Sequence, residues 1–551
     1  MSSSTRIAVI LAYNTCRFHS KKVVLKANIV RDCVIPFLRT WVSHPLNTSV
    51  TAEDLELRAI ILGKWWNTLL DMLKELHNDR ISGHDRPIVL EAIIGIMERP
   101  EWTLALKGSV PGLDKPTIFD NERRKSSISA QSSGRSSISN SSTPGGLVGD
   151  NVRNIFVQTL LDQIGLVVGK MSQRTTPASL VSFCGKACAY AFMFCPGIAD
   201  VMIRLWGIQP ARLKRVLKVF EVDSPFRFQA EAESMVSYFP ASLKSLSFVS
   251  LKDAIFKLRQ NREIPDVVKH VDWHGYWLKR WSGKDSDLFY AFVKQYHVLL
   301  SDFVPTNAMK NEWICAPGVL PVYAQILANL DMTIHRHSGA RAHSPTKADD
   351  SKTEPAAVTF DDVLGADASA DAFAPASINA SRMIADNRLV NLLQDLLPLR
   401  PPPYAPASYL FAEGFCEILK AAAAHTSIYD HPACFTLCDF LQESIVILAK
   451  FESNASVASL IDWKFWMDVL TRMARSENTL TQIRLYTLLY TLWPLIAANA
   501  YWKEHVCINV LLEPGYFETR FTHYCPLLRT YYQRLLCWRV GRCDEASEKD
   551  M

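Results

Sequence analysis

Glycine, β-strand patterns and enzyme signatures are all scarce in this chain. There are 22 glycines among 551 residues, with no sustained alternation of apolar and polar residues and no Asn-Gly hairpin turn, which disfavours folds built from β-sheets. Phosphate-binding loops, dinucleotide-binding glycine motifs, metalloprotease motifs and serine-hydrolase elbows are also absent from the sequence. We therefore predict that the protein is not an enzyme, and we assign it no catalytic residue, cofactor or metal. An enzyme whose site no motif reveals is the remaining alternative.

Strong charge of one sign is lacking as well. The formal net charge is only +5, so no nucleic-acid partner is expected. The 13 cysteines are odd in number and lie mostly within apolar runs, which indicates buried, reduced thiols and a cytoplasmic location. No signal peptide is recognisable. Residues 1–31 are basic and contain several serines, like a mitochondrial presequence, although we prefer to interpret them as a basic first helix.

Long hydrophobic runs are nearly absent, with one exception. Whether the protein inserts into a membrane depends on how this run is interpreted. Leu485 to Trp502 is free of charge over a length that just reaches a membrane span. Pro494 interrupts this run, and Asn499 would be unfavourable in lipid. We predict a buried helix of a large helical protein, and the alternative is an integral membrane protein inserted through Leu485–Trp502.

Helical periodicity fills most of the remaining sequence. Apolar residues recur at helix spacing from Leu55 to Leu76, from Val152 to Met171 and from Leu485 to Ile496. Thr51 and Asp54 form a plausible capping box ahead of the first of these runs. The fold class predicted is all-α: either an α-solenoid of the HEAT or armadillo kind, or a large irregular helical domain.

Two polar segments interrupt this pattern and are expected to be disordered inserts. One is rich in serine and the other in alanine and aspartate, and both are too poor in apolar groups to compensate the entropy of ordering. The second holds an apolar and acidic stretch, 358–364, that could be a docking motif, although we prefer to interpret it as an acidic spacer that keeps the segment solvated. The predicted organisation is helical blocks at 1–110, 150–337 and 378–543, inserts at 111–149 and 338–377, and a disordered tail at 544–551.

The serine-rich insert is the predicted site of regulation. Arg123-Arg124-Lys125 directly precedes a serine, which is the arrangement that a basophilic kinase recognises. Phosphorylation would turn this basic segment acidic and could release it from an anionic surface. The candidate phosphorylation sites are Ser126, Ser127, Ser136 and Ser137.

Two helical patterns suggest contact with a membrane or a partner protein. One is a dense basic run and the other a tryptophan stripe with basic neighbours. The alternative for the basic run is a solvated helix face, and the alternative for the tryptophan stripe is ordinary core packing. In each case we prefer the alternative. The contact candidates are Arg212, Lys214, Arg215, Lys218, Trp273, Trp277 and Trp281.

Metal ligands are suggested only weakly. His270 and His274 have the spacing of two zinc ligands on a helix, but a third ligand is not evident apart from the distant His297. Two cysteine pairs, Cys184 with Cys188 and Cys434 with Cys438, lack the second pair of a zinc site. We interpret all of these as structural residues.

One block of sequence is similar to a known family. Phe183 to Trp206 resembles the signature of a fungal family of unknown function, in which some members carry a membrane-protein label; Val152–Val157 and Arg400–Tyr404 fit the same resemblance. It covers roughly 150–540 and implies neither an activity nor functional residues. The function expected is a non-enzymatic scaffold that binds partner proteins in the cytoplasm, with peripheral attachment to a membrane surface as one location.

Overall fold

The computed structural model describes residues 23–41, 51–75, 86–102, 144–260, 262–283, 287–336, 387–398, 404–455 and 459–541. Every regular element in these ranges is a helix, so the predicted all-α class is confirmed. The N-terminal elements are α2 (Val23–Ile29), the π-helical η1 (Val30–Val34), α3 (Ile35–Trp41), α4 (Ala52–Glu75), α5 (Arg86–Met97), α7 (Pro144–Met171) and α8 (Ala178–Phe194).

The central part of the chain consists of shorter helices. They are α9 (Ile198–Arg204), α10 (Pro210–Val219), α11 (Pro225–Val236), the 3₁₀ turn η3 (Ala241–Leu246), α12 (Leu251–Arg259), the 3₁₀ turn η4 (Asp266–Val268), α13 (Trp277–Trp281), α14 (Leu288–Leu300), α15 (Lys310–Trp313) and α16 (Val319–Ile334).

Longer helices return in the C-terminal part. They are α19 (Arg388–Leu396), α20 (Tyr404–His425), α21 (His431–Ala455), α22 (Trp463–Ala474), α23 (Thr479–Ala497), α24 (Ala500–Val506), the π-helical η5 (Cys507–Leu511), α25 (Pro514–Phe521), α26 (Pro526–Leu535) and the π-helical η6 (Leu536–Val540).

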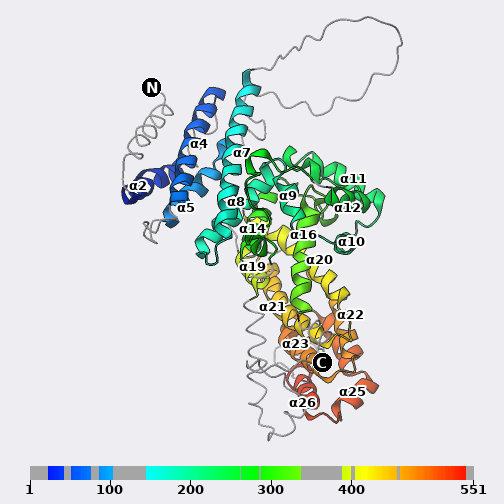
Figure 1. Cartoon of the computed structure of the whole chain (residues 1–551). Helices are drawn as coiled ribbons and strands as arrows, with labels where there is room; N and C mark the ends of the chain where they lie inside the picture. The colour runs from blue at the N-terminus through cyan, green and yellow to red at the C-terminus, as the bar shows by residue number, and fades with distance from the viewer. Residues whose placement is uncertain are drawn as a thin grey trace, which may run out of the picture.

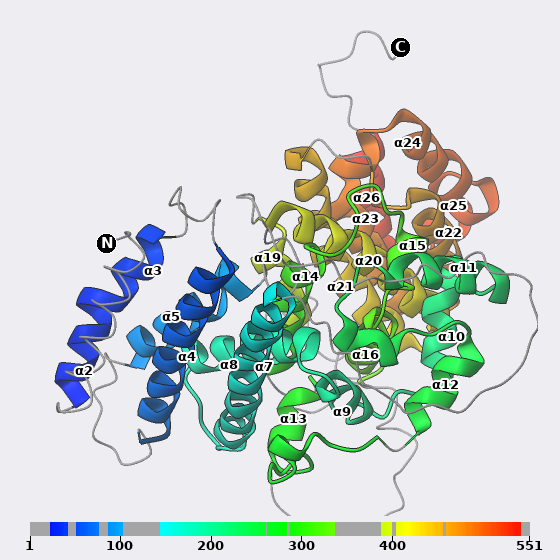
Figure 2. The same cartoon turned by 90° about the horizontal axis from the view of Figure 1, so that it is seen from above.

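The first and last helices follow in space the order of the sequence, whereas α14 returns to the middle of the molecule and packs against α8. α2 to α5 lie on one side, α7 and α8 in the middle, α9 to α12 on the opposite flank, and α21 to α26 at the far end (Figure 1). Seen from above, α2 and α24 lie at opposite sides of the molecule (Figure 2). This progression is compatible with a solenoid, but a regular superhelical stack remains a prediction.

Local signals in the sequence explain where individual helices begin. The hydroxyl of Thr51 accepts a hydrogen bond from the backbone N–H of Asp54 at 3.2 Å, so the predicted N-cap of α4 is confirmed. α7 begins at Pro144, whose fixed φ and missing N–H suit a first helical turn. α7 therefore extends into the segment that we predicted to be an insert up to residue 149. The rest of both inserts lies outside the described residues.

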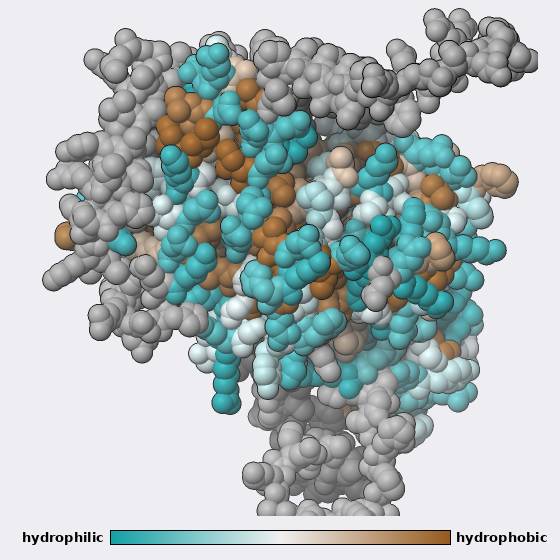
Figure 3. Space-filling model, turned by 45° about the horizontal axis from the view of Figure 1, so that its top comes forward, coloured by the Kyte–Doolittle hydropathy of each residue, from teal (hydrophilic) through white to brown (hydrophobic). Residues whose placement is uncertain are grey.

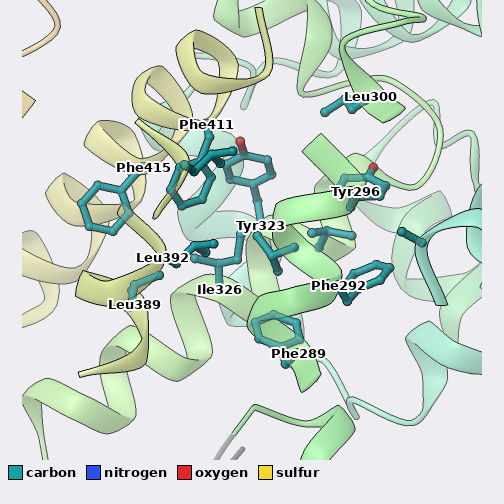
Figure 4. Packing of buried hydrophobic residues seen from close by; sticks show 14 of the residues in the cluster. Phe289, Phe292, Tyr296, Leu300, Tyr323, Ile326, Leu389, Leu392, Phe411 and Phe415 are labelled. Atoms are coloured by element: carbon teal, nitrogen blue, oxygen red, sulfur yellow. The ribbon is translucent and has the colours of Figure 1, made fainter. Parts of the chain in front are cut away.

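The core forms where wide apolar faces of several helices meet. Figure 4 shows side chains of α14, α16, α19 and α20 directed towards one another. The rings of Phe292 and Tyr296 stack 5.5 Å apart on α14, and His297 on the same helix is 5.0 Å from the ring of Phe411 on α20. Aromatic pairs at these separations stabilise a core beyond the burial of their area.

Candidate functional site

α10 presents its positive charges outwards because its apolar residues all lie on one side. Leu213, Val216 and Leu217 are buried, whereas Lys214 and Lys218 are exposed one helical turn apart. Pro210 occupies the first turn of the helix, where its missing N–H costs nothing. The helix has no acidic residue, so nothing within α10 neutralises these ammonium groups.

α12 also exposes basic residues on one side, and an aromatic ring lies among them. The hydroxyl of Ser250 caps its first turn by accepting from the N–H of Asp253 at 3.1 Å. Lys252, Phe256 and Arg259 follow at positions i, i+4 and i+7, so they share one face, and all three are exposed. Phe256 is 64% exposed, so its phenyl ring is available for contact.

A shallow pocket of about 180 Å³ lies between these two helices. Leu213 contributes to its floor from α10, and Ile255 and Leu258 contribute from α12. Arg259 lines the same pocket, so α10 and α12 lie side by side there. We call Lys214, Lys218, Lys252, Phe256 and Arg259 the α10–α12 face.

The cations of this face are not engaged in the fold. Within the described part of the chain, Lys214, Lys218, Lys252 and Arg259 have no ion-pair partner. The single acidic residue on the two helices, Asp253, is paired with Lys257 at 2.9 Å. Figure 3 shows mostly hydrophilic residues, with isolated hydrophobic ones, on the right flank where α10 to α12 lie; hydrophobic residues gather instead at the upper left. The arrangement can bind an anionic surface electrostatically.

The structure divides the predicted basic run into two groups. Lys214 and Lys218 are exposed, as a contact site requires. Arg215 is not available, because its guanidinium pairs with both carboxylate oxygens of Asp331 at 2.6 and 2.9 Å and donates to the carbonyl of Ala421 at 3.0 Å. Arg212 is half-buried. The proposal of Arg215 as a contact residue is therefore corrected: it joins α10 to α16 and α20.

The tryptophan stripe is also corrected as a contact site. Trp273, Trp277 and Trp281 are all buried, at 3%, 0% and 0% exposure. Trp281 stacks on Trp206 with ring centroids 5.2 Å apart, and each indole N–H of the three donates to a backbone carbonyl. Buried indoles need such partners. Core packing is therefore the role of this stripe, and its alternative role at a membrane interface does not fit the structure.

The predicted structural histidines and cysteines do not assemble a metal site. His270 and His274 are exposed, while His297 is buried in the core between α14 and α16. No group of three metal-binding side chains occurs among the described residues. Cys184, Cys188, Cys434 and Cys438 are buried free thiols. Burial raises the pKa of Cys184 and Cys188 well above the ordinary value, which keeps both thiols protonated.

The predicted phosphorylation sites and the predicted docking stretch cannot be placed. Ser126, Ser127, Ser136 and Ser137 lie outside the described residues, as does the acidic stretch 358–364. Conversely, Lys252, Phe256 and Arg259 were not predicted as functional residues. The spacing of exposed cations around one aromatic residue over a single amphipathic segment, 251–259, was the signal that could have identified them.

Comparisons with known proteins agree with the resemblance seen in the sequence. Residues 415–540, from within α20 to the end of η6, match a family described as "Protein of unknown function (DUF1765)". The chain is 22% identical over 399 residues to the "UPF0592 membrane protein C7D4.03c" of Schizosaccharomyces pombe. The predicted resemblance to a fungal family of unknown function is confirmed. The alignment covers 71% of this chain but 42% of that relative's length. No solved structure matches the chain.

The membrane label of this relative directs attention to the longest apolar helices. Leu485–Trp502 is not one helix: α23 ends at Ala497, and Asn499 starts α24 by accepting hydrogen bonds from the N–H groups of Tyr501 and Trp502. The stretch Leu485–Trp502 therefore does not form one continuous membrane-spanning helix. The break between α23 and α24 has a local cause, because the side chain of Asn499 caps the new helix and so competes with continuation of the old one.

Another helix is long and apolar enough to cross a membrane. Among the described residues it is α21, and 56% of its most apolar stretch is buried in the fold. α8 and α9 pass the same test only if they are taken as one span bent by 118°. These findings concern length and composition alone. Membrane association is compatible with them, but neither insertion nor peripheral binding follows.

Proposed function

We propose that this protein is a non-enzymatic helical scaffold that binds partner proteins and attaches reversibly to an anionic membrane surface, on its cytoplasmic side, through the α10–α12 face. The observation that carries the proposal is the exposure, on two adjacent helices, of Phe256 and of four cations that have no ion-pair partner among the described residues. The relative's label as a membrane protein supports this location. Catalysis has no part in the proposed role.

Charge complementarity selects an anionic lipid surface as the ligand of this face. Each Lys or Arg near such a surface contributes about 1 kcal/mol, so four contribute about 4 kcal/mol in total. Phe256 adds apolar burial at the level of the lipid headgroups. The sum is that of a reversible attachment rather than an insertion, and it weakens with salt because the charges are exposed.

Protein partners would bind to helical surfaces outside the α10–α12 face. The relative's label says nothing of a partner, so the scaffold part of the proposal depends on the extended arrangement of helices in Figure 1. Regulation would come from the serine-rich insert. Phosphorylation by a basophilic kinase at Ser126, Ser127, Ser136 or Ser137 adds about −1.5 to −2 charges per site, which opposes attachment of a basic face to an acidic membrane.

Vesicle sedimentation tests the attachment. The full chain is mixed with vesicles of phosphatidylcholine alone or with phosphatidylserine, and the variant changes Lys214, Lys218, Lys252 and Arg259 to Gln. Loss of about 4 kcal/mol predicts that binding to the anionic vesicles falls by about a thousandfold, or below detection. Phe256→Ala weakens binding by roughly fivefold, because part of a phenyl burial is lost.

A matched control removes the same charge elsewhere. Lys64, Lys450, Lys464 and Lys503 are exposed, lie outside α10 and α12, and have no ion-pair partner within the described ranges. Changing these four to Gln should alter vesicle binding by less than about threefold, because distant charges are screened. Equal losses for both quadruple variants would show that net charge alone, and not this face, governs attachment.

Membrane insertion through α21 is the competing function, and an alkaline carbonate wash of cell membranes separates the two. A peripheral protein leaves the membranes with the wash, whereas an inserted one stays in the pellet. Asp439 lies in the middle of α21 and is buried against Arg484, and a carboxylate at the centre of a bilayer costs about 3 kcal/mol. Retention of the chain in the washed pellet would overturn the peripheral proposal.

A further inference from the structure

The turn between α10 and α11 contains a pattern that proline-directed kinases recognise. Ser224 is followed directly by Pro225, and Arg227 comes three residues after the serine. Such a kinase accepts proline after the serine because the missing N–H of proline needs no partner there. It binds the cation further along through its own acidic groups. The same four-residue pattern also occurs at 344–347, which lies outside the described residues.

The structure leaves this whole pattern at the surface. Ser224, Pro225, Phe226 and Arg227 are all exposed, and the exposed fraction of Phe226 is 88%. Arg227 has no ion-pair partner among the described residues. A kinase can therefore reach the hydroxyl, the proline ring and the guanidinium from solvent.

The hydroxyl of Ser224 takes no part in capping the helix that follows it. Ser224 directly precedes α11 with an extended backbone, and its side chain makes no capping hydrogen bond. Ser250 occupies the same position before α12, and its hydroxyl accepts from the N–H of Asp253. Of these two serines, only Ser224 has a hydroxyl that is not engaged in a cap, so its modification removes no capping bond.

The first turn of α11 can open to fit a kinase, which binds its substrate as an extended strand. The first buried residue of this helix is Phe228, and its N–H donates to the carbonyl of Ser224 at 3.0 Å. Opening the turn breaks this bond and the next ones along the helix, but it uncovers no core side chain. Helix ends of this kind open locally at low cost.

We propose that Ser224 is phosphorylated by a proline-directed kinase and that the phosphate weakens attachment of the α10–α12 face to an anionic membrane. The second part rests on the proposed function, and the first part does not. In the reaction the Oγ of Ser224 forms a bond to the γ-phosphorus of ATP, and the bond from that phosphorus to the bridging oxygen of ADP breaks. The hydroxyl proton passes to a carboxylate of the kinase, so phosphoserine and ADP are the products.

Ser224 lies near the end of α10 that carries Lys218. The N–H of Val222 bonds back to the carbonyl of Leu217 at 2.9 Å, which folds the turn onto the helix. Ser224 follows Val222 by two residues, a span of at most about 8 Å. α11 lies on the same flank of the molecule as α10 and α12 in Figure 1 and Figure 2. A phosphate there adds about −1.5 to −2 charges, which offsets one or two of the cations that attract the membrane.

Treatment of the full chain with a purified cyclin-dependent kinase and MgATP tests the site, in a Ser344→Ala background that removes the second pattern. Mass spectrometry of the peptides should find phosphate on Ser224. Pro225→Ala and Arg227→Gln, both at exposed positions, should each lower the rate by about tenfold or more, because each removes one contact with the kinase. Absence of phosphate on Ser224, or equal rates for both variants and the unaltered chain, would overturn the assignment.

The chain offers two controls. Arg262 is exposed and lies outside the pattern, so Arg262→Gln should be phosphorylated within about twofold of the unaltered rate, because a charge outside the bound segment is screened. Thr176 also precedes a proline, but its hydroxyl accepts from the guanidinium of Arg280, and Ser179 takes the place of the cation three residues on. No phosphate is expected on Thr176.

Sedimentation with phosphatidylserine vesicles tests the consequence. The phosphorylated chain should bind about tenfold more weakly than the untreated chain, and kinase-treated Ser224→Ala should bind as the untreated chain does. Equal binding by the phosphorylated and untreated chains would overturn the regulatory part. If neither chain binds these vesicles, the proposed function and this consequence both fail, whereas the modification itself is decided by the phosphate found on Ser224.

Discussion

Two long helix pairs of this protein are held together in opposite ways. Between α8 and α14 the contact is apolar and very close, because Gly185, which has no side chain, faces the methyl group of Ala291 and the backbone between Ala291 and Phe292. Between α21 and α23 the contact contains an ion pair, in which Arg484 binds Asp439 at 12% and 5% exposure.

The difference shows that helices with wide apolar faces can be held together by different contacts. These contacts respond differently to changes of side-chain volume, pH and salt. A glycine contact depends on volume and is indifferent to pH and salt, since no charge is involved. A buried ion pair depends on the presence of both partners, because either charge left alone would be desolvated without compensation. Each of the following experiments either breaks one of these two contacts or measures what distinguishes them.

The largest effect is expected from breaking the ion pair. Asp439→Ala leaves the Arg484 guanidinium nearly buried and without its carboxylate, so the free energy of unfolding should fall by about 3 kcal/mol or more. Burial raises the pKa of Asp439 to about 6, and Arg484 offsets only part of that rise. The urea titration is therefore run at about pH 8, where the carboxylate is charged.

The control removes both partners together. Asp439→Leu combined with Arg484→Met leaves no unpaired charge, and it should lose less than about 1.5 kcal/mol, because apolar residues of similar volume replace buried ion pairs with little penalty. If the double variant were as unstable as Asp439→Ala, the helix contact would depend on packing rather than on charge.

A smaller loss is expected from adding one methyl group between α8 and α14. A Cβ on Gly185 would lie 2.7 Å from the carbonyl carbon of Ala291 and 2.8 Å from the backbone nitrogen of Phe292. Backbone atoms cannot move aside as a flexible side chain would, so Gly185→Ala should lower the free energy of unfolding by about 2 kcal/mol.

Gly169 on α7 provides the matched control for this substitution. A Cβ at Gly169 would meet no described atom within 4 Å outside its own helix backbone. Gly169→Ala should therefore raise stability by about 0.5–1 kcal/mol, since alanine is the better helix former. Thermal unfolding of both variants gives the comparison, and a gain at both positions would mean that α8 and α14 do not approach as closely as described.

Helices of both contacts were predicted from the sequence, but the residues that join each pair of helices were not. The apolar positions of 152–171 and of 485–496 were predicted from periodicity, and Phe156, Leu160, Leu488 and Leu492 among them are indeed buried. Periodicity reports which face of a helix is covered. It does not report what covers that face, so the partners Asp439 and Ala291, distant in sequence, could not be predicted.

The candidate surfaces show the same limit. Lys214 and Lys218 were predicted because α10 carries a local run of basic residues. Asp331 and Ala421, which bind the guanidinium of Arg215, are distant in sequence, so no local pattern showed that Arg215 is unavailable for contact. The break at Asn499 was missed for a related reason, since one side-chain cap decides between a single long helix and two.

The smallest effect, per pH unit, is the change of stability with pH. Its sign is opposite for His297 on α14 and for Asp439 on α21. His297 on α14 is buried: its Nδ1 bonds to the carbonyl of Val293 and its Nε2 to the hydroxyl of Tyr323, both at 2.8 Å. Burial lowers the pKa of His297 from 6.5 to about 4. Between these pH values the unfolded chain holds the extra proton, so stability is lost as pH falls, by about 1.4 kcal/mol per pH unit.

Asp439 acts in the opposite direction over an overlapping range. Its pKa in the folded protein is about 6, against an ordinary 3.8, so there the folded state holds the extra proton and stability falls as pH rises. His297→Phe with Tyr323→Phe removes the first dependence and leaves no unpaired hydroxyl, while Asp439→Asn removes the second. Relative to the unaltered chain, urea unfolding between about pH 4 and 6 should give slopes of stability against pH that change by about 1.4 kcal/mol per unit, downwards in the first variant and upwards in the second. Parallel curves for all three proteins would show that neither group titrates as its burial requires, and the contrast between the two helix contacts would then be one of shape alone.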